Sequence, residues 1–142
     1  MPQMESMTIH RPQIACIVGP TASGKTALSI RVAQMTGAEI VSADSVQVYC
    51  GMDIGSAKPT PEERQGIPHY MIDCVQIDRP GFSVSAYRDM AVEAIGAIER
   101  NGHLPLVVGG SGLYVNSLIY PLNFAVPSDA SIRARLEMKY PA

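Results

Sequence analysis

The chain has 142 residues, of which 46% are hydrophobic and 17% are charged, and its formal net charge is −2. This size and composition are typical of one globular domain with a buried core, and they lack the basic excess of a nucleic-acid-binding surface. The three cysteines are odd in number and form no C-x-x-C pair, which argues against a disulfide framework or a zinc site and favours the cytoplasm. No stretch approaches the ~18 apolar residues of a membrane span, so we expect no membrane partner.

The beginning of the chain predicts a tail followed by a strand and a loop. Residues 1–12 lack the apolar segment of a signal peptide and are expected to be a flexible tail, and residues 13–142 are expected to form one core. Residues 14–18 are an apolar run, typical of a strand that is buried on both faces. A glycine-containing loop, residues 19–26, follows this strand directly.

The segment after the loop predicts a helix and a second strand. Gly37 is expected to end the helix. The inner face of the helix is expected to carry Leu28, Val32 and Met35. Residues 38–43 predict a strand that brings Asp44 and Ser45 to its carboxyl end, and in an open parallel sheet this end faces the ligand crevice.

The middle of the chain predicts a long loop, a third strand and a second long helix. Residues 46–68 contain three glycines and three prolines, which indicates a binding loop rather than long regular elements. Residues 70–75 predict the third strand. Ser85 is expected to cap the helix, which ends at Asn101. Its buried stripe is expected to comprise Met90, Ala91, Ala94, Ile95 and Ile98.

The last part of the chain predicts a fourth strand and two further helices. Residues 104–108 form this strand, residues 113–119 a short helix, and Ser128 is expected to cap the final helix. Strands that alternate with helices indicate a parallel α/β sheet. We therefore expect a P-loop NTPase-like sheet flanked by helices, incomplete at its carboxyl end.

The loop after the first strand matches the pattern G-x-x-x-x-G-K-[ST]. Its glycines allow backbone N–H groups to converge on phosphate oxygens, and the following helix adds the positive end of its dipole. The lysine can reach an outer phosphate, and the final hydroxyl can ligate Mg²⁺. An ordinary glycine-rich turn is the alternative. The candidate phosphate-binding residues are Gly19, Pro20, Thr21, Ala22, Ser23, Gly24, Lys25 and Thr26.

Asp44 is the second candidate site residue, because it is expected at the carboxyl end of the second strand, across the crevice from this loop. The carboxylate could contact Mg²⁺, or it could accept a proton as a general base. It could also be a solvated group that caps the next turn, since Asp before Ser is common in turns. The residues alone leave these three roles open.

Four stretches of the chain, taken together, are similar to one family. They are residues 19–26, residues 44–59, residues 68–73 and residues 105–114. These stretches resemble the tRNA dimethylallyltransferases, also called tRNA isopentenyltransferases, in the same order and at compatible spacing. The resemblance implies transfer of a dimethylallyl group from dimethylallyl diphosphate to N6 of the adenosine next to the anticodon in tRNA.

The resemblance also implies roles for individual residues. The loop would hold the diphosphate, with Thr26 on Mg²⁺ and Thr21 near the ester oxygen as a catalytic group. Asp44 would bind and deprotonate the adenine amine. The residues implied at the tRNA are Asp44, Ser45, Val46, Gln47, Ser111 and Arg133. Ser111 could instead belong to a glycine-rich turn, and Arg133 could be a solvated helix charge. Lys58 is expected to be an exposed lysine outside the site, and His69 a packed or edge histidine.

The chain departs from the family in length, because family members continue well beyond residue 142 into a helical insertion that grips tRNA and a further arginine at the diphosphate. We interpret the chain as a fragment or the product of a truncated gene, monomeric, able to hold diphosphate but inactive alone. The tRNA anticodon loop would be a partner of the full-length protein. Three alternatives stay open: a small-molecule kinase, an enzyme that prenylates free adenine nucleotides, and a non-catalytic diphosphate-binding remnant.

Overall fold

The structure, a computed structural model, describes residues 13–78, 81–122 and 130–140. The expected tail over residues 1–12 and the expected cap Ser128 lie outside the described residues. The elements in chain order are β1 Ala15–Val18, α1 Lys25–Thr36, β2 Glu39–Ser42, α2 Pro61–Arg64, β3 His69–Tyr70, α3 Val84–Arg100, β4 Pro105–Gly109, α4 Gly112–Ile119 and α5 Ala130–Lys139. No described helix is both long enough and apolar enough to cross a membrane.

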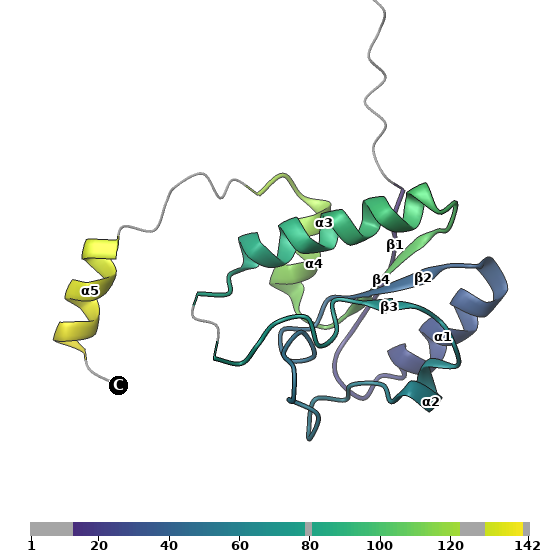
Figure 1. Ribbon diagram of the computed structural model, residues 1–142, viewed down its shortest axis with the longest axis horizontal. Helices are drawn as coiled ribbons and strands as arrows, with labels where there is room; N and C mark the ends of the chain where they lie inside the picture. The colour runs from purple at the N-terminus through teal and green to yellow at the C-terminus, as the bar shows by residue number, and fades with distance from the viewer. Residues whose placement is uncertain (1–12, 79–80, 123–129, 141–142) are drawn as a thin grey trace, which may run out of the picture.

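The strands form one sheet in the order β1-β4-β2-β3, and every pair is parallel (Figure 1). Strand β4 lies between β1 and β2, so that Leu106 is opposite Ala15 on one side and Ile40 on the other. The parallel α/β class expected from the alternation of strands and helices is confirmed. The carboxyl ends of β1, β2 and β4 therefore meet at one edge of the sheet.

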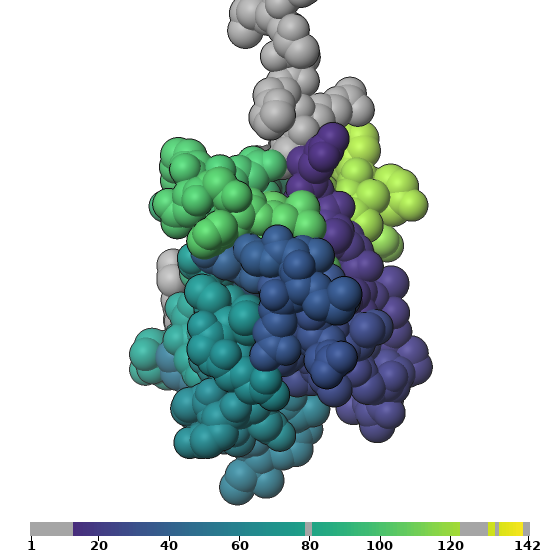
Figure 2. Space-filling view, turned by 90° about the vertical axis from the view of Figure 1, so that its right-hand side faces the viewer, coloured from purple at the N-terminus to yellow at the C-terminus, as the bar shows by residue number. Residues whose placement is uncertain are grey.

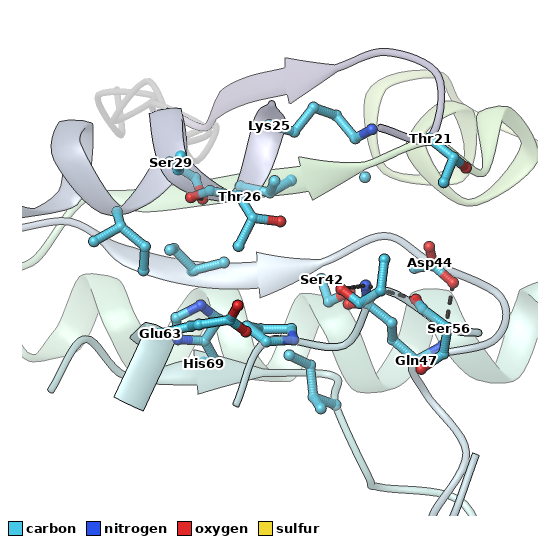
Figure 3. A pocket seen from close by; sticks show the side chains of 18 of the residues that line it. Thr21, Lys25, Thr26, Ser29, Ser42, Asp44, Gln47, Ser56, Glu63 and His69 are labelled. Atoms are coloured by element: carbon cyan, nitrogen blue, oxygen red, sulfur yellow. Dashed lines mark hydrogen bonds between the residues drawn. The ribbon is translucent and has the colours of Figure 1, made fainter. Parts of the chain in front are cut away.

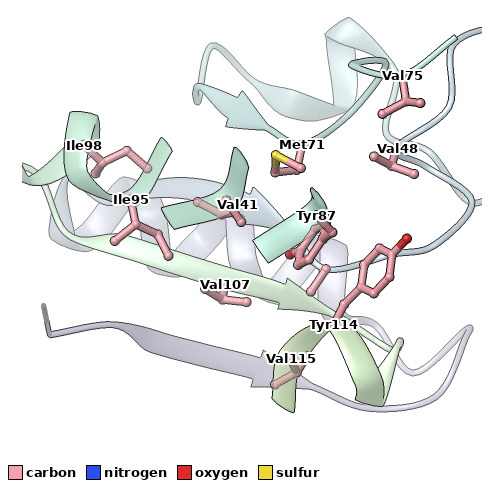
Figure 4. Close-up of a cluster of buried hydrophobic side chains, with 12 residues drawn as sticks. Val41, Val48, Met71, Val75, Tyr87, Ile95, Ile98, Val107, Tyr114 and Val115 are labelled. Atoms are coloured by element: carbon pink, nitrogen blue, oxygen red, sulfur yellow. The ribbon is translucent and has the colours of Figure 1, made fainter. Parts of the chain in front are cut away.

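Helices cover both faces of this sheet. Helices α3 and α4 pack on one face, where Val41 and Val107 of the sheet pack with Tyr87 and Ile95 of α3 in the larger core cluster (Figure 4). Helix α1 packs on the other face in a second apolar cluster, which comprises Ile30, Ala33, Ala38, Ile40 and Leu106. Three layers of this kind bury the central strands on both sides.

The predicted inner face of α1 was wrong at Leu28 and Met35 but right at Val32, which is half-buried and packs against the second apolar cluster. Leu28 is 54% exposed and Met35 is 82% exposed, whereas Ser29, Ile30 and Ala33 are buried. Docking on the sheet sets this rotation, because Ile30 and Ala33 of α1 pack in one apolar cluster with Ile40 and Leu106 of the sheet. The predicted stop is confirmed, because Gly37 adopts φ 70° and donates its N–H to the carbonyl of Ala33.

Two strand predictions need correction. The third strand was expected over residues 70–75 but covers only His69–Tyr70, because Met71 and Asp73 adopt left-handed φ values of 63° and 53°. The first strand was expected to be buried on both faces, yet Val18 is 58% exposed. The burial of β1 alternates: Ala15 and Ile17 are half-buried against the second apolar cluster, whereas Cys16 and Val18 on the other face are exposed. Within the described residues β1 pairs with β4 alone and is an edge strand.

Helix α3 begins two residues earlier than expected. Ser83, and not Ser85, is its N-cap, since the Ser83 hydroxyl accepts a hydrogen bond from the N–H of Ala86 at 3.2 Å. Ser85 lies inside the helix. The expected stripe is confirmed in its buried members Ala91, Ile95 and Ile98, and Tyr87 extends it by one turn toward the amino terminus.

Candidate functional site

A pocket of about 740 Å³ lies at the edge where the strands end. Its walls come from residues 21–27 and the following turn of α1, from the end of β2 with Asp44 and Gln47, from residues 55–57, and from α2 and β3 (Figure 3). On the outer surface α1 and the segment of α2 and β3 lie side by side (Figure 2), and the Gln34 side chain donates to that of Gln65 at 2.7 Å. The pocket thus lies between the predicted loop and the predicted carboxylate.

The Gly19–Thr26 loop connects β1 to α1 as expected. Gly24 at φ 83° and Ala22 at φ 62° make the left-handed turns that fold it back toward the sheet. Its first residue is anchored to the carboxyl end of β4, where the N–H of Gly19 contacts the Gly109 carbonyl at 3.4 Å. A side chain at Gly110 would lie 2.9 Å from the Gly19 oxygen, so a glycine there permits this close approach.

The loop presents positive groups to the pocket. Gly24 caps α1 without a side-chain hydrogen bond, and the first turn of this helix carries no acidic residue, so side chains neither cap nor neutralise its positive end. The Lys25 ammonium folds back over the loop and donates to the carbonyl of Pro20 and, at 3.4 Å, to the Ser23 hydroxyl. Thr21 and Thr26 line the same pocket (Figure 3). Such an arrangement suits a polyphosphate anion.

Asp44 lies two residues beyond β2 and lines the pocket. Its Oδ1 accepts hydrogen bonds from the N–H groups of Val46 at 2.8 Å and Gln47 at 3.1 Å. The carboxylate therefore caps the following turn, which was one of its predicted roles. The same hydrogen bonds hold it at the pocket wall, facing the side on which Thr21 lies (Figure 3). Capping and a role in the pocket are compatible.

Gln47 is held by three neighbours. Its Oε1 accepts from the Ser42 hydroxyl at 3.1 Å, and its Nε2 donates to the carbonyls of Ser56 at 3.3 Å and Ala57 at 3.1 Å. Through these contacts the Gln47 side chain links the end of β2 to residues 56–57 of the long loop. Val46, next to it, is 37% exposed and also lines the pocket.

The structure brings Ser111 and Ser45 together, although they are far apart in the sequence. The Ser111 hydroxyl accepts the N–H of Ser45 at 2.9 Å and lies 3.2 Å from the Ser45 hydroxyl. The N–H of Ser111 donates to the Ala43 carbonyl at 3.2 Å, and Ser111 is the N-cap of α4. Arg133, by contrast, lies in α5, and none of the side chains that the structure describes in this helix lines the pocket.

Tyr87 is a site-supporting residue that sequence reasoning missed. Its hydroxyl donates to the Ser42 carbonyl at 2.9 Å, and its ring stacks on Tyr114 with centroids 4.0 Å apart. Burial raises the pKa of Tyr87, so the hydroxyl stays a hydrogen-bond donor. The contact fixes the end of β2 shortly before Asp44. The only signal in the sequence was the position of Tyr87, one helical turn before the predicted stripe.

Two more residues differ from or extend the predictions. Lys58 was expected to be exposed, but its side chain is only 6% exposed and pairs with Asp53 and Asp73. His69 is half-buried in β3, and its Nδ1 donates to the Ile67 carbonyl at 2.8 Å. Burial lowers the pKa of His69, so the ring is neutral at pH 7. It lines the pocket together with Glu63 (Figure 3).

Comparison with known proteins identifies the family. The profile described as IPP transferase matches residues 47–142. The chain belongs to the IPP transferase family. It is 53% identical over 118 residues to the tRNA dimethylallyltransferase of Staphylococcus carnosus, covering 83% of this chain and 37% of the relative. It is 49% identical over 141 residues to that of Moorella thermoacetica, covering 96% of this chain and 43% of the relative.

A solved member of the IPP transferase family shares the fold. The tRNA isopentenylpyrophosphate transferase of Bacillus halodurans superposes with a TM-score of 0.78 at 44% identity, over 91% of this chain and 43% of that protein. The family and fold expected from the four sequence stretches are thus confirmed. The chain spans less than half the length of these three relatives.

Proposed function

We propose that this chain supplies the diphosphate-binding and base-receiving part of an enzyme that transfers a dimethylallyl group from dimethylallyl diphosphate to N6 of the adenosine next to the anticodon in tRNA. The observation that carries the proposal is the pocket itself. The Gly19–Thr26 loop lines one side of this pocket and Asp44 lines the other. The chain also belongs to the IPP transferase family, so a donor and an acceptor of a prenyl group are the expected occupants.

The loop would hold the diphosphate of the donor. Backbone N–H groups at the amino end of α1, the Lys25 ammonium and the Thr21 hydroxyl can all donate to phosphate oxygens. Stabilising charge on those oxygens also stabilises diphosphate as it departs from carbon. The loop would therefore serve prenyl transfer without any transfer of a phosphoryl group.

The oxygen groups of the pocket also suit a magnesium ion. The Thr26 hydroxyl, at the start of α1, lines the pocket on the side of the loop, and Mg²⁺ prefers oxygen ligands together with water and phosphate. No group of three or more His, Cys, Asp or Glu side chains among the described residues forms a separate metal site. Thr26 and the diphosphate would hold the ion between them. The ion would help to neutralise the negative charge that develops on the diphosphate as it leaves.

Asp44 would accept the proton that the adenine amine loses. In this step N6 attacks C1 of the dimethylallyl group, the C–O bond to diphosphate breaks, and the N–H proton passes to the carboxylate. Asp44 is held by two N–H donors on Oδ1, so it is oriented in advance. Val46 and Gln47 line the same wall and would receive the adenine, which must leave the anticodon-loop stack to reach the pocket.

Transfer is tested in a completed chain, defined as residues 1–142 joined to the remaining carboxyl part of the Moorella thermoacetica relative, because this chain covers 43% of that relative. Labelled dimethylallyl diphosphate and unmodified tRNA should yield labelled tRNA, with the Moorella enzyme as the positive control. Phosphoryl transfer from ATP to a metabolite at a comparable rate would instead support the kinase alternative. A cytoplasmic location and a monomeric state stay predictions.

A further inference from the structure

Lys58 is an enclosed cation directly after the pocket wall formed by residues 55–57. Its side chain is 6% exposed, and its Nζ donates to the Tyr49 carbonyl at 3.0 Å, to Asp53 Oδ1 at 2.8 Å and to Asp73 Oδ1 at 2.6 Å. An ammonium group has three donors, so these three acceptors satisfy it completely. Lys58 therefore has no hydrogen-bonding capacity left for a phosphate or a base.

Two of the acceptors, Tyr49 and Asp53, lie on the same loop as Lys58, and the third, Asp73, follows β3. Tyr49 forms a parallel bridge with Val75, and Asp73 lies between this bridge and β3, where it adopts φ 53°. Asp53 precedes the bend at Gly55, which adopts φ 73°. Lys58 thus ties a loop with few regular backbone hydrogen bonds to the segment that follows β3.

The loop that Lys58 holds in place forms one wall of the pocket. Gly55, Ser56 and Ala57 line it immediately before Lys58. The carbonyls of Ser56 and Ala57 are the acceptors for the Gln47 amide, at 3.3 Å and 3.1 Å. The backbone carbonyl of Gln47 in turn accepts the N–H of Asp73 at 3.1 Å. The side chain and the backbone of Gln47 therefore both bind to segments that Lys58 holds in place.

We propose that Lys58 is a positioning residue for prenyl transfer: by clamping Asp53, Asp73 and Tyr49 it fixes the 55–57 wall and, through it, the orientation of the Gln47 amide at the base-receiving side of the pocket. The inference rests on the proposed function. Lys58 touches neither substrate in this scheme and acts only through Gln47.

The electrostatics agree with a permanent clamp. Burial by itself lowers the pKa of Lys58, but the hydrogen bonds to Asp53 and Asp73 outweigh it and raise the pKa above its usual value. The ammonium stays charged throughout the physiological range. The side chains of Asp53 and Asp73 are 68% and 42% exposed, so these partly solvated ion pairs add little net stability, while the three hydrogen bonds of Lys58 hold one geometry. A clamp of this kind is therefore better suited to orienting a wall than to stabilising the fold.

The test compares Lys58→Met with Lys58→Arg and Asp73→Asn in the completed chain. We expect Lys58→Met to lower kcat/KM for tRNA by roughly 10- to 100-fold, since small misplacements of positioning groups have effects of this size. Pyrophosphate affinity should change less than about 2-fold, because the hydrogen bonds of Lys58 go to Tyr49, Asp53 and Asp73 and not to the Gly19–Thr26 loop. Lys58→Arg should restore part of the activity, and Asp73→Asn should show a smaller loss that is not additive with Lys58→Met. Arg100→Met, an exposed cation at the opposite end of the sheet, is the matched control.

A second measurement uses residues 1–142 alone. In Lys58→Met the amides of Cys50 and Asp73, which donate to the Val75 and Gln47 carbonyls, should exchange with solvent faster, while the amides of α1 should not. Unchanged kcat/KM in Lys58→Met, or a parallel loss of pyrophosphate affinity and transfer, would overturn the inference. Failure of the unsubstituted completed chain to transfer the prenyl group would overturn the proposed function, and this inference with it.

Discussion

The α-carbon of Gly109 at the end of β4 packs directly against the backbone of Ala43 after β2. A methyl group at Gly109 would lie 2.9 Å from the Ala43 α-carbon and closer still to its carbonyl oxygen. The same two strands are joined here by the Ala43 N–H, which donates to the Val108 carbonyl at 2.8 Å. The contact sets the spacing of the strand ends that carry the loop anchor and Asp44.

Gly109→Ala is therefore expected to destabilise the chain, because backbone atoms cannot move aside without separating β4 from β2. Overpacking of this kind costs about 1–3 kcal/mol, and urea unfolding measures it. Gly112→Ala is the matched control, since a methyl group there meets nothing within 4 Å and lies in the first turn of α4. Equal stability of the two variants would contradict the close contact.

Lys25→Ala should weaken binding of pyrophosphate to residues 1–142. Hydrogen bonds to charged groups contribute about 1.5–3 kcal/mol, so the dissociation constant should rise roughly 10- to 100-fold. The rise in melting temperature caused by Mg²⁺ and pyrophosphate measures this effect. Lys139→Ala in α5 changes a residue that does not line the pocket and should behave like the unsubstituted chain, and equal losses in both variants would argue against a specific site.

Asp44→Asn should slow prenyl transfer by the completed chain by about 10²–10⁴, which is the usual effect of losing a general base. Asparagine keeps the Oδ1 acceptor for Val46 and Gln47, so the turn should survive. Single-turnover transfer and pyrophosphate affinity are measured together, with the exposed Asp89→Asn as control. Loss of Mg²⁺-dependent pyrophosphate binding with normal tRNA affinity would favour the metal role of Asp44 instead.

Glu39→Gln should lower the free energy of unfolding at pH 7 and should make that free energy depend less on pH in the acid range. Burial alone would raise the pKa of Glu39, but hydrogen bonds from Tyr70, at 2.7 Å, and from His103 lower it below its usual value. A lowered pKa means that this stabilisation is present above about pH 4.5 and is lost as the pH falls through the lower folded-state value. Urea unfolding at pH 7 and pH 3.5 checks this, with the exposed Glu93→Gln as control. A stability gap between Glu39→Gln and the unsubstituted chain that stays constant with pH would contradict it.

Residues 1–142 alone should bind Mg²⁺-pyrophosphate but neither bind nor prenylate tRNA at physiological salt. The loop needs only β1, its turn and α1, whereas tRNA binding needs an extended positive surface that a chain of net charge −2 lacks. Thermal shift, gel shift and single-turnover transfer are run side by side. Saturable tRNA binding by this chain would show that its recognition surface lies within these residues.

Local patterns were sufficient for several parts of this protein. The loop between β1 and α1, the stop at Gly37 and the buried residues of α3 depend on spacing and on residue types within a few positions, and the structure agrees with them. The family was also readable, because its motifs are contiguous stretches. Asp44 could be placed at the crevice since a parallel sheet gathers strand ends at one edge.

Other features depended on contacts between distant segments. The rotation of α1 followed from docking on the sheet, and the early end of β3 followed from the left-handed turns at Met71 and Asp73. The pairing of Ser111 with Ser45 arises because β4 lies next to β2. Lys58 looked like a surface lysine, because no local pattern shows that a carbonyl and a carboxylate of its own loop, together with Asp73 after β3, surround it. The sequence by itself determined which groups stand at each strand end, whereas only the tertiary structure decided which of them meet, since strand order and helix packing are set by burial over the whole chain.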